Sequence, residues 1–190
     1  MIEELDEKND REMLKKLPLE KLFDVFFLHI RNLWRVDGLY FLGIEEKFGT
    51  EAATEIDANS WKILAKIEAR DLKRTLGIEK VEDIETLLYL LRNTSWALYQ
   101  TKKAVEIDPS KTAGRFRVVS CRVQEARLRK GLEIFPCKRV RFGYLRNFAK
   151  ELNPNFEVEC IVCPPDEKPP DYWCEWEFRL KDKKMNENWA

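Results

Sequence analysis

Thiol side chains are the groups in this sequence best suited to chemistry, and they gather toward the C-terminal half. Residues 159–178 read ECIVCPPDEKPPDYWCEWEF and hold three of the five cysteines. Cys160 and Cys163 form a C-x2-C pair, which can supply two of the four ligands of a tetrahedral zinc ion, with Cys174 as a third. The sequence contains no second C-x2-C pair and no C-x-x-H pair. Three interpretations follow: core packing, a functional thiol cluster in a pocket, or a zinc site.

The alternation of apolar and polar residues bears on this choice. Phe156, Val158 and Cys160 share one face of a predicted strand, which puts Cys163 on the other face. Cys174 lies on the apolar face of the next predicted strand. The pattern predicts two antiparallel strands joined by a proline-stiffened loop, with Cys160 and Cys174 as neighbours on the buried face.

Cys121 and Cys137 lie among basic residues, in VVSCRVQEAR and FPCKRVR. Neighbouring arginine and lysine favour thiolate over thiol. Cys121 also lies near a predicted strand-to-helix turn, where helix N–H groups stabilise negative charge. If one thiol is a nucleophile, we expect it to be one of these two. The alternative is that both are inert.

The predicted helical half has its own candidates. His29, the only histidine, lies on the apolar stripe of its helix, a position typical of a hydrogen-bonded core residue. With Glu45 and Glu68 it could hold a zinc or iron ion inside a helical bundle. Pairing of Glu68 with Arg31 or Arg35 explains the same residues without a metal. The sequence therefore requires no cofactor, and a metal site stays an alternative.

Composition limits the class of protein. The 190 residues are 44% hydrophobic and 36% charged, with 34 basic and 34 acidic residues, which suits one domain rich in charged amphipathic helices. The acidic start predicts no signal peptide, and the most apolar run, LFDVFFLHI, is too short to cross a membrane. An odd number of cysteines without a secretion signal predicts reduced thiols in the cytoplasm.

Patterning predicts an α+β fold as a single domain over residues 1–190. A helical half over 10–93 would pack on an antiparallel sheet of about four strands within 94–182, with two helices inserted between the second and third strands. We expect a kink at Asp37-Gly38, a helix end at Gly49-Thr50, and a flexible tail over 183–190. In the long helix over 51–76, the predicted inward stripe consists of Ala53, Ile56, Ser60, Ile63 and Ile67.

Residues 111–150 form a basic segment, with twelve Lys or Arg against only Glu125 and Glu133. The isoelectric point near 6.7 and the lack of a recognisable nucleic-acid-binding motif argue against a nucleic-acid partner. Cross-strand pairs of Arg115 or Arg117 with Glu157 or Glu159 would account for part of the charge. A small anionic ligand held by one or two arginines is the favoured interpretation, with Arg122 as one candidate.

Several stretches together resemble a family of prokaryotic cytosolic proteins built on a domain of unknown function. They include NLWRVDGLYFLGIEEKFG, KIEARDLKRTLGI and CPPDEKPPDYWCEWEF, and the W-x2-DG-x2-F-x3-E run is the most specific. The C-terminal half is distantly similar to the L-2-amino-thiazoline-4-carboxylic acid hydrolase family, through Cys121, Cys137, Asn153-Pro154 and Cys174. This similarity implies ring opening of a small cyclic amidine-like substrate with cysteine or carboxylate participation.

We therefore expect a cytosolic protein that binds a small molecule and acts as a hydrolase on a small anionic or cyclic amidine-like substrate. The alternatives are a non-catalytic ligand-sensing or protein-interaction module and a metal-binding protein, and a homo-oligomer is compatible with each. The candidate catalytic residues are Cys121, Cys137, Glu45 and Glu68. The candidate ligand-binding residues are Trp34, Asp37, Trp61, Cys174 and Arg122.

Overall fold

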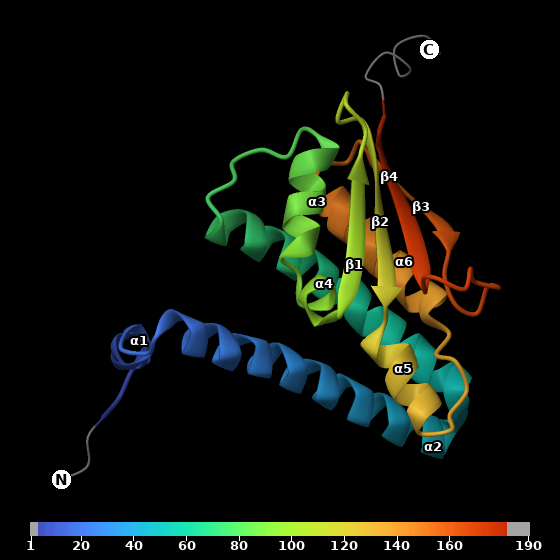
Figure 1. The fold of residues 1–190 in the computed structure, drawn as a ribbon, viewed down its shortest axis with the longest axis horizontal. Helices are drawn as coiled ribbons and strands as arrows, with labels where there is room; N and C mark the ends of the chain where they lie inside the picture. The colour runs from blue at the N-terminus through green and yellow to red at the C-terminus, as the bar shows by residue number, and fades with distance from the viewer. Residues whose placement is uncertain (1–3, 182–190) are drawn as a thin grey trace.

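The computed structural model of the chain describes residues 4–181, and it is an α+β protein (Figure 1). The predicted fold class is confirmed, with two helices between the second and third strands. The predicted tail over 183–190 lies outside the described residues. The elements are, in order, α1 (Glu7–Lys15), α2 (Leu19–Thr75), α3 (Ile84–Arg92), α4 (Ser95–Tyr99), β1 (Lys102–Ile107), β2 (Ala113–Ser120), α5 (Arg122–Arg129), α6 (Cys137–Leu152), β3 (Phe156–Val162) and β4 (Cys174–Leu180).

The four strands form one antiparallel sheet in the order β1-β2-β4-β3. One face packs on helices, with Phe116, Trp176 and Phe178 fully buried. On β2, Arg115 pairs with Glu177 and Arg117 with Glu175, both at 2.8 Å. The predicted partners on β3 were wrong, because β4 lies between β2 and β3.

The cysteines of this sheet differ from the predicted arrangement. Cys160 pairs in register with Trp176 and not with Cys174, which pairs with Val118 of β2. Cys163 is fully buried, although alternation placed it on the other face. The register shifts between Cys160 and the end of β3, and such a bulge moves every later residue to the opposite face.

Helix α2 bends once, at Gly49, whose φ of 86° and ψ of 163° are the only non-helical values inside it. A positive φ suits glycine because a Cβ would clash with the backbone there. The predicted break at 49–50 is therefore correct in place, whereas the kink predicted at Asp37-Gly38 is wrong. Gly38 has helical backbone angles. The packing of Trp34 and Phe41, on either side of it, against the protein body holds this part of the helix straight.

The second half of α2 packs along α6 through small residues. Ala58, Trp61, Ala65 and Ala69 form its buried stripe, together with Ala53. Of the predicted inward stripe, Ala53 is buried as expected. The prediction was wrong for the isoleucines, which are exposed: Ile56, Ile63 and Ile67. Alanines allow two helix backbones to approach closely, so on this helix the small residues, not the large aliphatic ones, face the partner helix.

Candidate functional site

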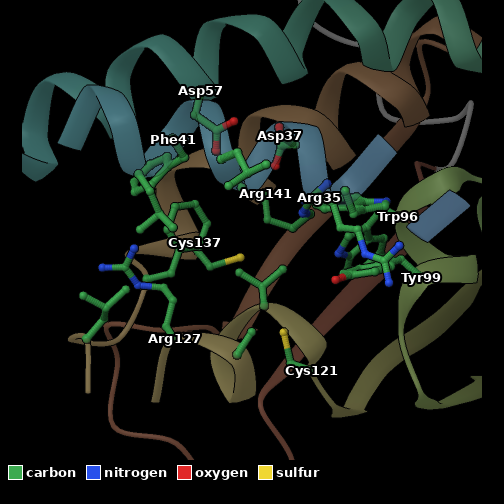
Figure 2. A pocket seen from close by; sticks show the side chains of 18 of the residues that line it. Arg35, Asp37, Phe41, Asp57, Trp96, Tyr99, Cys121, Arg127, Cys137 and Arg141 are labelled. Atoms are coloured by element: carbon green, nitrogen blue, oxygen red, sulfur yellow. The ribbon is translucent and has the colours of Figure 1, made fainter. Parts of the chain in front are cut away.

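A cavity of about 320 Å³ lies where the two halves of α2 meet α4, α5 and α6 (Figure 2). The first half of α2 contributes Trp34 and Asp37, and the second half contributes Asp57 and Trp61. Helix α6 contributes Cys137 at its first position and Arg141 one helical turn further along. The bend at Gly49 is what brings the two halves of α2 together on this cavity.

Stacked aromatic rings form one wall. The ring of Trp34 lies 4.7 Å from that of Trp61 at an interplanar angle of 16°, and 5.0 Å from that of Tyr99 at 7°. The indole of Trp34 donates to the Ser95 carbonyl at 3.1 Å, and that of Trp61 donates to Asp37 Oδ1 at 3.1 Å. These hydrogen bonds fix the stacked rings, so the aromatic wall is pre-formed.

Arg141 is the unusual residue of the site, because its side chain is only 2% exposed and yet incompletely paired. Its guanidinium lies over Trp96 and Tyr144 at 4.8 Å, and over Trp61 at 5.1 Å. Among the described residues, Nε and Nη1 of Arg141 have no hydrogen-bond acceptor. Ring faces partly compensate a buried cation, but unmet donors are costly. The cavity wall therefore contains a fixed positive charge, two of whose nitrogens lack an acceptor among the described residues.

Two carboxyl groups accompany this cation. Burial, together with the negative charge of Asp37, raises the pKa of Asp57 to about 7, against the opposing pull of Arg141. Burial also raises the pKa of Asp37, while Arg141 and the Trp61 hydrogen bond oppose the rise. Figure 2 shows Asp37, Asp57 and Arg141 close together on one side of the cavity. Asp57 can therefore gain or lose a proton near neutral pH.

The thiols fall into two groups. A hydrogen bond with Cys163 lowers the pKa of Cys137, with a further contribution from Arg141 and against the effect of burial. Burial raises the pKa of Cys121 and of Cys163, and it raises that of Cys160 to about 11. Since the thiolate is the reactive form, Cys137 is the thiol of this site best suited to act as a nucleophile.

The structure gathers five of the predicted site residues on the cavity: Trp34, Asp37, Trp61, Cys121 and Cys137. The other four lie elsewhere. Glu45 makes a bidentate ion pair with Arg127, whose Nη1 and Nη2 donate to the two carboxylate oxygens at 2.8 and 2.9 Å. Glu68 accepts from the Ser95 backbone at 2.7 Å and from the Tyr144 hydroxyl at 2.6 Å. Both glutamates are thus already engaged in structural contacts.

Cys174 and Arg122 also lie off the cavity lining. Cys174 accepts a hydrogen bond from the Trp176 indole at 3.3 Å, and the Arg122 guanidinium lies over the ring of Tyr99 at 5.7 Å. His29 is exposed on α2, so the core position predicted for it is wrong. In residues 4–181, no three His, Cys, Asp or Glu side chains converge as a metal site would require. The two candidate ligand sets, Cys160 with Cys163 and Cys174 and His29 with Glu45 and Glu68, are therefore not assembled.

Sequence reasoning missed Arg141 and did not select Asp57, the two charged residues at the centre of the site. The sequence nevertheless contains a pattern that points to the burial of each residue. Arg141 follows Cys137 by four residues and is adjacent to the buried Val140, on the apolar side of its helix. Asp57 precedes Trp61 by four residues, so the two share a helix face. A charged residue on the apolar face of a helix is expected to be buried, and a buried charge needs a partner.

Fold and site together define an α+β protein with an aromatic-walled cavity around a buried arginine. A family model described as "Family of unknown function (DUF6125)" matches residues 15–180, and the chain belongs to this family. The match spans α2 through β4 and so includes every cavity residue discussed above. No curated protein matches the chain significantly. Within residues 4–181, no helix has the length and apolar character needed to cross a bilayer.

Proposed function

We propose that the protein binds a small anionic molecule in this cavity, with the acidic group of the ligand on Arg141. The buried guanidinium with unpaired Nε and Nη1 is the observation that carries the proposal. A carboxylate accepts strong, charge-assisted N–H bonds from a guanidinium, and no described side chain accepts from Nε or Nη1 of Arg141. Binding would thus satisfy donors that the unliganded protein leaves unmet.

The shape of the cavity favours a flat ligand body. Its volume of about 320 Å³ suits a small metabolite. Trp34, Trp61 and Tyr99 line the cavity as an aromatic stack, and contact with these rings favours an unsaturated or aromatic ring by more than area burial alone. The preferred ligand is therefore small and planar with one acidic group.

Hydrolysis in the same cavity is a second candidate function, favoured by Asp57 with its pKa of about 7. A group that titrates near the working pH can accept a proton from water as the water attacks. The similarity to the L-2-amino-thiazoline-4-carboxylic acid hydrolase family points to a ring that carries both an amidine and a carboxylate. Arg141 suits the carboxylate, and Asp37 with Asp57 suits the amidine. Cys137 offers a thiol as an alternative nucleophile.

Ligand charge can be tested with three molecules of nearly equal shape: benzoate, benzamide and benzamidine. Quenching of tryptophan fluorescence reports binding, because three tryptophans line the cavity. We expect benzoate to bind most tightly, and Arg141→Met to weaken benzoate by about tenfold or more while sparing benzamide. Arg146→Met, an exposed position on the same helix, is the matched control. Equal affinity for benzoate and benzamide, or unchanged benzoate binding by Arg141→Met, would contradict the proposal.

Catalysis is tested separately, by mass spectrometry of 2-amino-2-thiazoline-4-carboxylic acid incubated with the protein. Asp57→Asn should abolish product formation, whereas benzoate binding should persist because Arg141 is intact. Ligand binding without product at any pH from 6 to 8 would reject hydrolysis of this substrate and favour the non-catalytic sensing module.

A further inference from the structure

We propose that the first part of α2, residues 19–33, is a dimerisation arm that pairs antiparallel with the same segment of a second copy of this chain. This arm runs out beyond the body of the protein, with α1 at its far end (Figure 1). Among the described residues, the side-chain hydrogen bonds and ring contacts of the arm go only to residues of the same helix. Of the apolar residues of the arm, only Ile30 packs against the core of the described chain, and the arm is still strongly apolar.

The apolar face of the arm continues the face that packs on the body. Phe27, Trp34 and Phe41 follow one another at seven-residue intervals, so they share one side of the helix. Trp34 and Phe41 are buried, with exposed fractions of 5% and 7%, whereas Phe27, where the body ends, is 38% exposed. A face patterned for burial thus extends about two turns further than the chain can cover it.

The exposed residues of this face repeat at alternating intervals of four and three, the pattern of a coiled-coil seam. They are Leu19, Phe23, Phe26, Ile30 and Leu33. Four of them are 45–63% exposed, and Ile30 is partly buried at the edge of the body. At about 200 Å² for a whole aromatic side chain and about half that for leucine, each arm offers on the order of 300 Å² of apolar surface. Two arms together provide about 600 Å², roughly two thirds of the apolar area of a standard interface of about 1,600 Å².

Charge on the arm favours a second copy over a membrane surface. Residues 19–33 hold two acidic residues, Glu20 and Asp24, and two basic ones, Lys21 and Arg31. A helix that lies on anionic lipid has a polar face rich in lysine and arginine, which this segment lacks. A two-fold axis brings the same patch of both chains together. Antiparallel pairing about the middle of the segment places Phe26 beside Phe26 of the second copy.

Light scattering after size exclusion tests the arm. The wild-type chain should elute as a dimer of twice 22.7 kDa. Phe26→Glu should weaken dimerisation about 100-fold or more, because the symmetric interface loses two buried rings and gains two buried charges. Leu28→Glu is the matched control: it is 41% exposed two residues away on the opposite face, and it should stay dimeric. Circular dichroism should show native helix content in both variants, since neither position is buried within the chain.

A charge-swap mixture tests the antiparallel geometry. Phe26→Glu and Phe26→Lys chains should each be monomeric alone and should form a mixed dimer when combined, because the opposite charges meet near the axis. A monomeric wild-type protein at 50 µM, a dimeric Phe26→Glu variant, or a mixture that stays monomeric would each overturn the proposal. Co-sedimentation of a monomeric wild type with phosphatidylcholine–phosphatidylglycerol vesicles would overturn it in favour of a lipid surface.

Discussion

Replacing Asp57 by Asn removes a carboxylate whose ionised form is disfavoured in the folded protein. Burial and the charge of Asp37 raise the pKa of Asp57 from 3.8 to about 7. Because the folded pKa lies above the unfolded one, the stability linked to this group is fully present below about pH 4 and is lost as the pH rises through 7. At about 1.36 kcal/mol per pKa unit, the loss amounts to at most about 4 kcal/mol.

Asparagine has the shape of the protonated side chain and cannot ionise. Asp57→Asn should therefore match the wild type near pH 3.5 and be more stable at pH 8.5 by about 2–4 kcal/mol, the lower value allowing for structural relaxation. Urea unfolding followed by tryptophan fluorescence at several pH values measures this difference, provided the m-values agree. Asp71→Asn, on the same helix and exposed, should show no such pH dependence. A constant difference, or an Asp57→Asn variant less stable than wild type at pH 8.5, would refute the electrostatic reasoning.

Three further predictions rest on single contacts. Iodoacetamide should modify Cys137 first, because its pKa is lowered where those of the buried thiols are raised; peptide mapping showing equal labelling of the cysteines would contradict this. Glu45→Gln should lower the free energy of unfolding by about 3 kcal/mol, since it leaves a mostly buried Arg127 without its charge partner; a urea midpoint unchanged from wild type would count against it. Gly49→Ala should lower the free energy of unfolding by about 1–2 kcal/mol, because Gly49 has a positive φ. Gly43→Ala, within regular helix, should raise it by up to about 1 kcal/mol. Calorimetry that shows the same sign for both variants would contradict the assignment of the bend.

Much of the fold could be predicted from the sequence because local patterns determined it. Period-two alternation identified β2, β3 and β4, and the order of helices and strands then required an α+β arrangement. Alternation stops being reliable where the backbone gains a bulge. For this reason Cys163 was assigned to the wrong face. The two glycine sites show a similar limit: tertiary packing keeps Gly38 helical, and only Gly49 takes a positive φ.

Half of the candidate site was predictable, since Trp34 and Asp37 lie one helical turn apart and, like Trp61, have side chains suited to binding. The centre of the site was not, because its significance depends on what surrounds it. An arginine within a basic segment is usually exposed, and only the packing of α6 against α2 shows that Arg141 is enclosed by tryptophans. Glu45 failed as a candidate for the opposite reason, since its partner, Arg127, lies 82 residues away in sequence.

A crystal structure of the protein grown with 4-bromobenzoate tests the central claim most directly, because anomalous scattering from bromine locates the ligand independently of the protein density. We predict the bromophenyl ring against the aromatic stack of Trp34 and Trp61, with a carboxylate oxygen about 2.7–3.0 Å from a guanidinium nitrogen of Arg141. An empty cavity at saturating ligand, or a ligand whose carboxylate points away from Arg141, would contradict the account.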